Sequence, residues 1–335
     1  MEKEIDKIIN IFKYAIKAEI AAFTGYYEGS KRVNIPEVKG ILLYLAEEER
    51  KHKTLLLDEY FKITNYGKAS SKKATKAKKE INKYKIPKKY SFKNLKTLSG
   101  IDTAGITLPM EIVSGDYLDT FTIADANGEN QKLVFILFDT MGHGLSATYI
   151  KSTTRAAFQS YAEKLRNTRK GGFTISPAYI VSEINKQIAK KCLKHGSFVT
   201  LFLGVIDLIK NELVYTSAGH EPPICICDIT DSVDELLRTQ LILGFDESTR
   251  YKENKIVINP DNTFVLFSDG IPEATNSNDE MFGRKKIIDT ILKYKKSSST
   301  EILNQIILKL KEHIGRKYIY DDISLLVLKI KNKPE

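Results

Sequence analysis

The residues with the clearest chemical potential are aspartates that stand where apolar strands begin or end. Asp116 comes just before one predicted strand, and Asp139 follows the apolar run 133–138. Farther along, Asp269 ends another apolar run, and Asp321 stands just before a strand near the C-terminus. Each aspartate alone could be an ordinary turn residue. Together they predict an oxygen-rich site for two hard cations such as Mg²⁺ or Mn²⁺.

Strands and helices must bring these aspartates together. Residues 116–139 read as a β-hairpin, because its second apolar run is too short and too bulky for a helix of its own. Pro177 opens a predicted helix, and the two helices after the hairpin would cover one sheet. The remaining predicted elements are helices over about 145–165 and 177–194, a hairpin over 197–217, two helices over 284–314, and a strand over 323–328.

A family resemblance follows from the order of the motifs SGDYLD, FDTMGHG, YTSAGHEPP, LFSDGIPEA and DDISLLVL. Over residues 99–331 the chain resembles the SpoIIE-type branch of the metal-dependent protein phosphatase (PPM, type 2C) family. The resemblance implies an α+β fold class with an α-β-β-α sandwich. It also implies an enzyme, a protein serine/threonine phosphatase that uses two Mn²⁺ or Mg²⁺ ions per catalytic domain. Its implied partner is a phosphorylated regulatory protein, such as a STAS-domain anti-sigma-factor antagonist.

The same resemblance assigns roles to individual residues. Asp139 is expected to bridge both metals, and the backbone carbonyl of Thr140 to complete one coordination shell. Asp269 and Asp321 are expected to bind the other metal, with Asp116 in or next to the shell. His143 and His220 are candidates to protonate the leaving oxygen, although a structural role in a turn is the alternative we favour. The weaker candidates are Gly115, Asp119, His143, His220 and Asp322.

The N-terminal segment carries a second possible metal site. Two predicted amphipathic helices, about 1–28 and 36–61, have apolar stripes that are interrupted by Glu19, Glu49 and His52. This is the ligand pattern of half a di-iron carboxylate bundle. Residues 1–63 resemble the first helix pair of rubrerythrin-like, ferritin-like proteins, which implies bound iron. A homodimer would complete the four-helix bundle; the alternative is a hairpin that dimerises without metal.

Composition limits the remaining possibilities. The net charge of +10 is concentrated in a lysine-rich connector, residues 64–98, which we expect to be a partly helical, solvated linker rather than a nucleic-acid site. The three cysteines are sparse and suggest buried thiols in a cytoplasmic protein. We find neither a signal peptide nor an apolar run long enough to cross a membrane, so no membrane partner is expected.

Two rival functions remain open. The chain could be a di-iron oxidase or peroxidase with an accessory phosphatase domain, although one helix pair supplies only half of such a site. It could also be a non-catalytic scaffold that binds a phosphoprotein. The presence of all four aspartates argues against the scaffold, since loss of metal ligands would be its signature.

Overall fold

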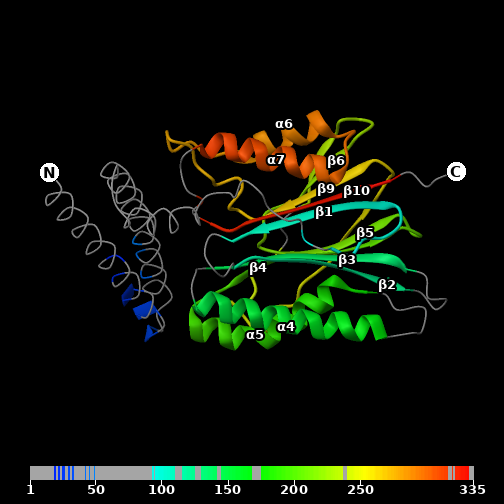
Figure 1. Ribbon diagram of the computed structural model, residues 1–335. Coiled ribbons are helices and arrows are strands. Elements are labelled where there is room, and N and C mark those ends of the chain that lie inside the picture. Colours follow the sequence, from blue (N-terminus) through cyan, green and yellow to red (C-terminus); the bar gives the residue numbers. More distant parts are fainter. Residues whose placement is uncertain are drawn as a thin grey trace, which may run out of the picture. The chain divides into compact units, whose positions relative to one another are not determined.

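The chain divides into two compact units, Met1–Lys85 and Ile86–Glu335, in a computed structural model (Figure 1). The division lies inside the predicted connector 64–98. In the first unit the structure describes residues 19, 22, 25, 26, 29, 30, 32, 33, 42, 45 and 49. In the second it describes residues 93, 95–109, 115–124, 130–141, 145–167, 175–236, 240–315, 319 and 321–331.

Two antiparallel sheets of five strands form the centre of the second unit. The first sheet has the order β1-β10-β9-β6-β7, and the second has the order β2-β3-β4-β5-β8. The strands of the first sheet are β1 (Ile101–Leu108), β10 (Ile323–Ile330), β9 (Asn262–Phe267), β6 (Ile224–Cys227) and β7 (Val233–Glu235). Those of the second are β2 (Tyr117–Ala124), β3 (Asn130–Thr140), β4 (Val199–Asp207), β5 (Glu212–Ala218) and β8 (Asn254–Val257).

Helices cover the outer face of each sheet, as Figure 1 shows. The pair α4 (Leu145–Asn167) and α5 (Pro177–His195) packs on the second sheet, and the pair α6 (Gly283–Tyr294) and α7 (Ser299–Ile314) on the first. The result is an α-β-β-α sandwich, which confirms the fold predicted for this part of the chain. The predicted hairpin over 116–139 and the four helices are likewise present.

Strand β3 shows how the sequence builds these layers. Its side chains alternate between two buried faces, as successive strand residues must. Val134 and Ile136 pack with the helices α4 and α5. Leu133 and Phe135 face the other way, into the core between the sheets, which Leu326 of β10 also enters. Burial on both faces explains why this strand is apolar without interruption.

Side-chain hydrogen bonds define where the helices begin and tie their loops. Ser176 caps α5 by accepting from the backbone N–H of Tyr179, and Pro177 follows it. Asn185 of α5, fully buried, donates to the carbonyl of Asp246 and accepts from the N–H of Gly244. This amide therefore anchors the loop around Gly244 and Asp246 to helix α5.

The described residues of the first unit are consistent with a helical hairpin. Glu19 and Glu49, two of the predicted iron ligands, are both helical and half-buried. The third ligand, His52, lies outside the described residues, as does the lysine-rich part of the connector before residue 93. Within the part of the chain that the structure describes, no helix is long and apolar enough to cross a membrane.

Candidate metal centre

The first pair of aspartates meets at the open end of the β2–β3 hairpin. In the antiparallel register Tyr117 lies opposite Phe138, so Asp116 and Asp139 are neighbours although they are 23 positions apart in the sequence. The start of β2 and the end of β3 therefore lie side by side. Thr140, the next residue of β3, is buried.

The second group forms where β9 ends and β10 begins. The backbone N–H of Ser268 donates to the carbonyl of Ser324 over 3.0 Å. The Ser268 hydroxyl donates to the carbonyl of Asp322 over 3.2 Å and accepts from the N–H of Ser324 over 2.9 Å. These bonds hold the Asp269-Gly270 turn against Asp321 and Asp322, so that two segments 52 positions apart share one edge of the first sheet.

The two groups meet across the sandwich. The backbone N–H of Gly115 donates to Asp322 Oδ2 over 2.5 Å, which joins the start of the hairpin to the other sheet. A Cβ atom at Gly115 would lie 3.1 Å from the carbonyl oxygen of Thr140 and 3.2 Å from Asp139 Oδ1. Glycine at this position therefore leaves room for oxygen atoms from both sheets to approach one another.

The electrostatics of the cluster show that these carboxyl groups interact. Burial, and then the nearby carboxylate of Asp322, raises the pKa of Asp116 to about 7. Burial, and then Asp269, raises the pKa of Asp321 to about 8. The pKa of Asp139 is also well above its ordinary value, first through burial and then through Asp116 and Asp321. Each shift has the sign expected when anions are crowded in a poorly solvated place.

A cluster of this kind fits divalent cations. Its donors are carboxylate oxygens, with the carbonyl of Thr140 beside them, which are the ligands that Mg²⁺ and Mn²⁺ prefer. Among the described residues, no three His, Cys, Asp or Glu side chains already form a coordination sphere. The fit rests on the chemistry of the donors and on their shared burial. Bound cations would offset both the burial of negative charge and the repulsion between the carboxylates, which together raise the pKa values.

The weaker candidates occupy different surroundings. His220 is buried, and its Nδ1 lies 3.0 Å from the hydroxyl of Thr200. Asp119 accepts from the Tyr117 hydroxyl over 2.6 Å and from the N–H of Thr120 over 2.9 Å. Both contacts would serve the packing of β2 and β4. His143 lies outside the described residues.

Basic residues beside the centre were missing from the predicted set. Lys151 of α4 has its pKa lowered by burial, while Asp116 and Asp322 act in the opposite direction. Arg155 lies one helical turn farther along the same helix, and Lys93 precedes β1. The spacing of Lys151 and Arg155 places them on one face of a helix, a signal that was available in the sequence. Nothing local in the sequence connects them with Lys93.

Comparison with known proteins identifies the family. Residues 129–331, more than half of the chain, match the family model described as stage II sporulation protein E (SpoIIE). The chain belongs to the SpoIIE family. Residues 10–101 of this SpoIIE-family chain match a second family model, described as rubrerythrin. Both resemblances predicted from the motifs are confirmed.

Individual relatives are distant. Phosphoserine phosphatase RsbU of Bacillus subtilis (strain 168) is 25% identical over 234 residues, which cover 69% of this chain and 64% of RsbU. The solved SiaA-PP2C domain of Pseudomonas aeruginosa has a TM-score of 0.58 at 20% identity, covering 68% of this chain and 85% of that one. RsbX in complex with magnesium has a TM-score of 0.52 at 18% identity, covering 72% and 100%.

The matched region covers only part of each curated relative. The SpoIIE-family chain spans between 36% and 64% of the length of the curated relatives it matches. The solved structures establish the PP2C-type fold.

Proposed function

We propose that this protein is a metal-dependent phosphatase that hydrolyses phosphoserine or phosphothreonine on a regulatory protein. The observation that carries the proposal is the convergence of Asp116, Asp139, Asp269 and Asp321 at one place in a SpoIIE-family fold. The name of the relative RsbU, a phosphoserine phosphatase, supports the same reaction. The magnesium complex of RsbX supports the choice of metal.

Each of the two sheets would supply part of the metal ligands. Asp139 would contact both metals, with Asp116 and the Thr140 carbonyl beside it on the second sheet. Asp269 and Asp321 would hold one metal from the first sheet. When bound, two Mn²⁺ or Mg²⁺ ions would supply an activated water and would neutralise charge on the phosphoryl group. Lys151, beside Asp116, adds a fixed positive charge at the edge of the same site.

The proposed substrate is a phosphorylated regulatory protein, of which a STAS-domain antagonist is the specific candidate. A scaffold that only binds such a protein would need no metal ligands, so the four aspartates favour catalysis. A di-iron oxidase would need a complete iron site, and the single helix pair of one chain supplies only half of such a site.

Metal removal tests the proposed reaction. We expect the full-length protein to release phosphate from a phosphoserine peptide and from a phosphorylated STAS-domain protein when Mn²⁺ or Mg²⁺ is present. Chelation with EDTA should stop the release, and Mn²⁺ should restore it, because water is a poor nucleophile without the metals. Phosphate release that continues unchanged in EDTA would contradict the metal mechanism. Tight binding of the phosphoprotein without turnover would support the scaffold instead.

We also propose that the N-terminal unit forms a homodimer that binds a di-iron centre through Glu19, Glu49 and His52. The rubrerythrin match over residues 10–101 and the half-buried, helical positions of the two glutamates support this assignment. Carboxylate and imidazole ligands suit iron. Its purpose would be regulation of the phosphatase by iron or by oxidation.

Iron analysis and sedimentation test this second proposal together. We expect anaerobically purified wild-type protein to sediment as a dimer with about one iron per chain, the ratio of a di-iron centre shared between two chains. The variant His52→Ala should lose the iron. A wild-type dimer without iron would leave the hairpin as a dimerisation device, and an iron-free monomer would contradict both parts.

A further inference from the structure

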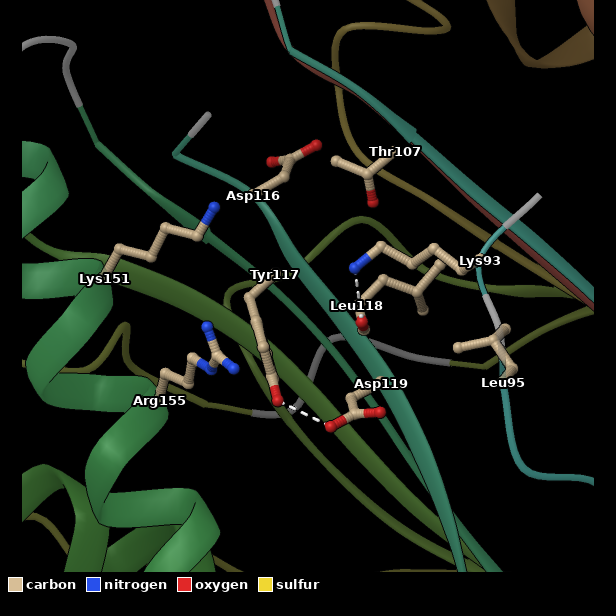
Figure 2. A pocket seen from close by; sticks show the side chains of 9 residues that line it. All are labelled: Lys93, Leu95, Thr107, Asp116, Tyr117, Leu118, Asp119, Lys151 and Arg155. Atoms are coloured by element: carbon tan, nitrogen blue, oxygen red, sulfur yellow. Dashed lines mark hydrogen bonds between the residues drawn. The ribbon is translucent and has the colours of Figure 1, made fainter. Parts of the chain in front are cut away.

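A pocket of about 320 Å³ opens beside Asp116, along strand β2 (Figure 2). Asp116, Tyr117 and Asp119 line one wall, while Lys151 and Arg155 of α4 face them from the neighbouring helix. Lys93, from the segment before β1, completes the basic lining. Because a strand rises about 3.3 Å per residue, the wall from Asp116 to Asp119 extends roughly 10 Å away from the metal centre.

The basic residues of this pocket influence one another. Burial lowers the pKa of Lys93, and the neighbouring charges of Lys151 and Arg155 contribute in the same direction, against the opposing effect of Asp119. The pocket therefore concentrates positive charge from two separate parts of the chain. An anion entering the pocket would be attracted by all three residues.

Tyr117 holds two of these cations in place. The guanidinium carbon of Arg155 lies 5.5 Å from the centre of the Tyr117 ring, and the Lys93 ammonium lies 5.7 Å from it. Both distances are within the range of cation–π attraction. The Tyr117 hydroxyl is fixed in turn by Asp119, as Figure 2 shows. Ordering the side chains before binding lowers the entropic cost of capturing a ligand.

The acids of the pocket are already engaged. Asp119 accepts hydrogen bonds from Tyr117 and from the N–H of Thr120, and Asp116 belongs to the metal centre. In the part of the chain that the structure describes, the salt bridges do not include Lys93 or Arg155. Lys93 uses one of its N–H groups on the carbonyl of Leu118 over 2.8 Å. Donors of both side chains therefore remain for a ligand.

We propose that this pocket is a specificity subsite that binds an acidic side chain of the substrate, close in sequence to the phosphorylated residue. The inference rests on the proposed phosphatase function and narrows its substrate class to phosphoserine or phosphothreonine with a neighbouring Asp or Glu. The roughly 10 Å length of the wall fits a carboxylate that lies one to three positions from the phosphorylated residue in an extended peptide. Arg155 is the principal contact, because its guanidinium can hold a carboxylate through two hydrogen bonds.

Matched peptides test the subsite in the full-length protein. One series carries a single Glu at each of the three positions on either side of phosphoserine, and the control series carries Gln. We expect kcat/KM to be about tenfold higher for at least one Glu peptide than for its Gln partner, the effect of a charge-assisted hydrogen bond. The preference should fall close to unity in Arg155→Gln and decline partly in Lys93→Gln. In Lys164→Gln, an exposed change farther along α4, it should stay at the wild-type value.

Each outcome bears on the proposal separately from the phosphatase reaction. Hydrolysis of both series without any preference in the wild type would overturn the subsite and leave the reaction intact. An equal loss for both series in Arg155→Gln, with unchanged melting temperature, would place Arg155 on the phosphoryl group and overturn the subsite. If neither series is hydrolysed, the proposed reaction fails, and fluorescence anisotropy with the same peptides decides the subsite. Preferential binding of Glu peptides that Arg155→Gln removes would support it, and equal binding would overturn it.

Discussion

The variant Asp139→Asn should lose phosphatase activity by about a thousandfold while its folded state becomes no less stable. Asp139 lies where both groups of carboxylates meet, and it is proposed to contact both metals. Asparagine has the same shape but no charge, so it should hold the metals poorly and leave the charge on the phosphoryl group uncompensated. Loss of one group that stabilises developing charge commonly costs a hundredfold to a thousandfold.

The folding stability of Asp139→Asn, unlike its activity, should not fall. Burial and the carboxylates of Asp116 and Asp321 raise the pKa of Asp139, so its negative charge is unfavourable in the metal-free protein. Removing that charge should leave the melting temperature in EDTA equal or higher. The exposed Asp289→Asn on α6 serves as the matched control and should change neither quantity. Wild-type turnover in Asp139→Asn would contradict the proposed metal centre. A large fall in its melting temperature would show that Asp139 has a structural role.

The variant Gly270→Ala should lose activity by about a hundredfold and also lose stability. A Cβ atom at this position would lie 2.0 Å from the carbonyl oxygen of Asp322, which is too close for any contact between backbone and side chain. The backbone around Asp321 and Asp322 must move to accept the methyl group, and the bond from the Ser268 hydroxyl would be strained. Overpacking of this kind costs about 1–3 kcal/mol of folding free energy.

The expected loss of activity in Gly270→Ala comes from movement of Asp321 and Asp322, since the substitution removes no metal ligand. A shift of about 1 Å in a catalytic group can reduce a rate a hundredfold. Gly25→Ala is the control, because its Cβ would meet no atom within 4 Å and alanine favours the helical conformation. Thermal melting and phosphate release, measured on both variants, separate the two effects. Wild-type activity in Gly270→Ala would show that the turn adapts and that its close packing is not needed for catalysis.

The elements of the second unit were largely predictable because their signals are local. The apolar run before Asp139 and the glycine after Asp269 indicate strand ends directly. The pairing of β1 with β10 is different, since it joins Ile101 to Ile330 across almost the whole domain. No local pattern specifies which distant strand a given strand will choose, so β1 was not anticipated as an element of the first sheet.

The candidate metal centre shows the same limit. Asp116, Asp139, Asp269 and Asp321 were each predicted from their motifs, but the bond from Gly115 to Asp322 depends on how two sheets pack. The cationic pocket was missed for a related reason. Its parts come from α4, β2 and the segment before β1, and only the spacing of two of the basic residues on α4 was visible in the sequence.

The position of β10 in its sheet has implications for how this protein is made. β10 lies between β1 and β9, yet it is the last strand along the chain, and Asp321 and Asp322 immediately precede it. During synthesis, the edges of β1 and β9 that pair with β10 therefore stay unpaired until β10 has been made. Unpaired strand edges tend to form hydrogen bonds with other chains. Pairing between such distant segments is also slow. Each nascent chain passes through a stage in which the first sheet is incomplete and the proposed catalytic centre has not yet formed, the stage at which chaperones are most useful.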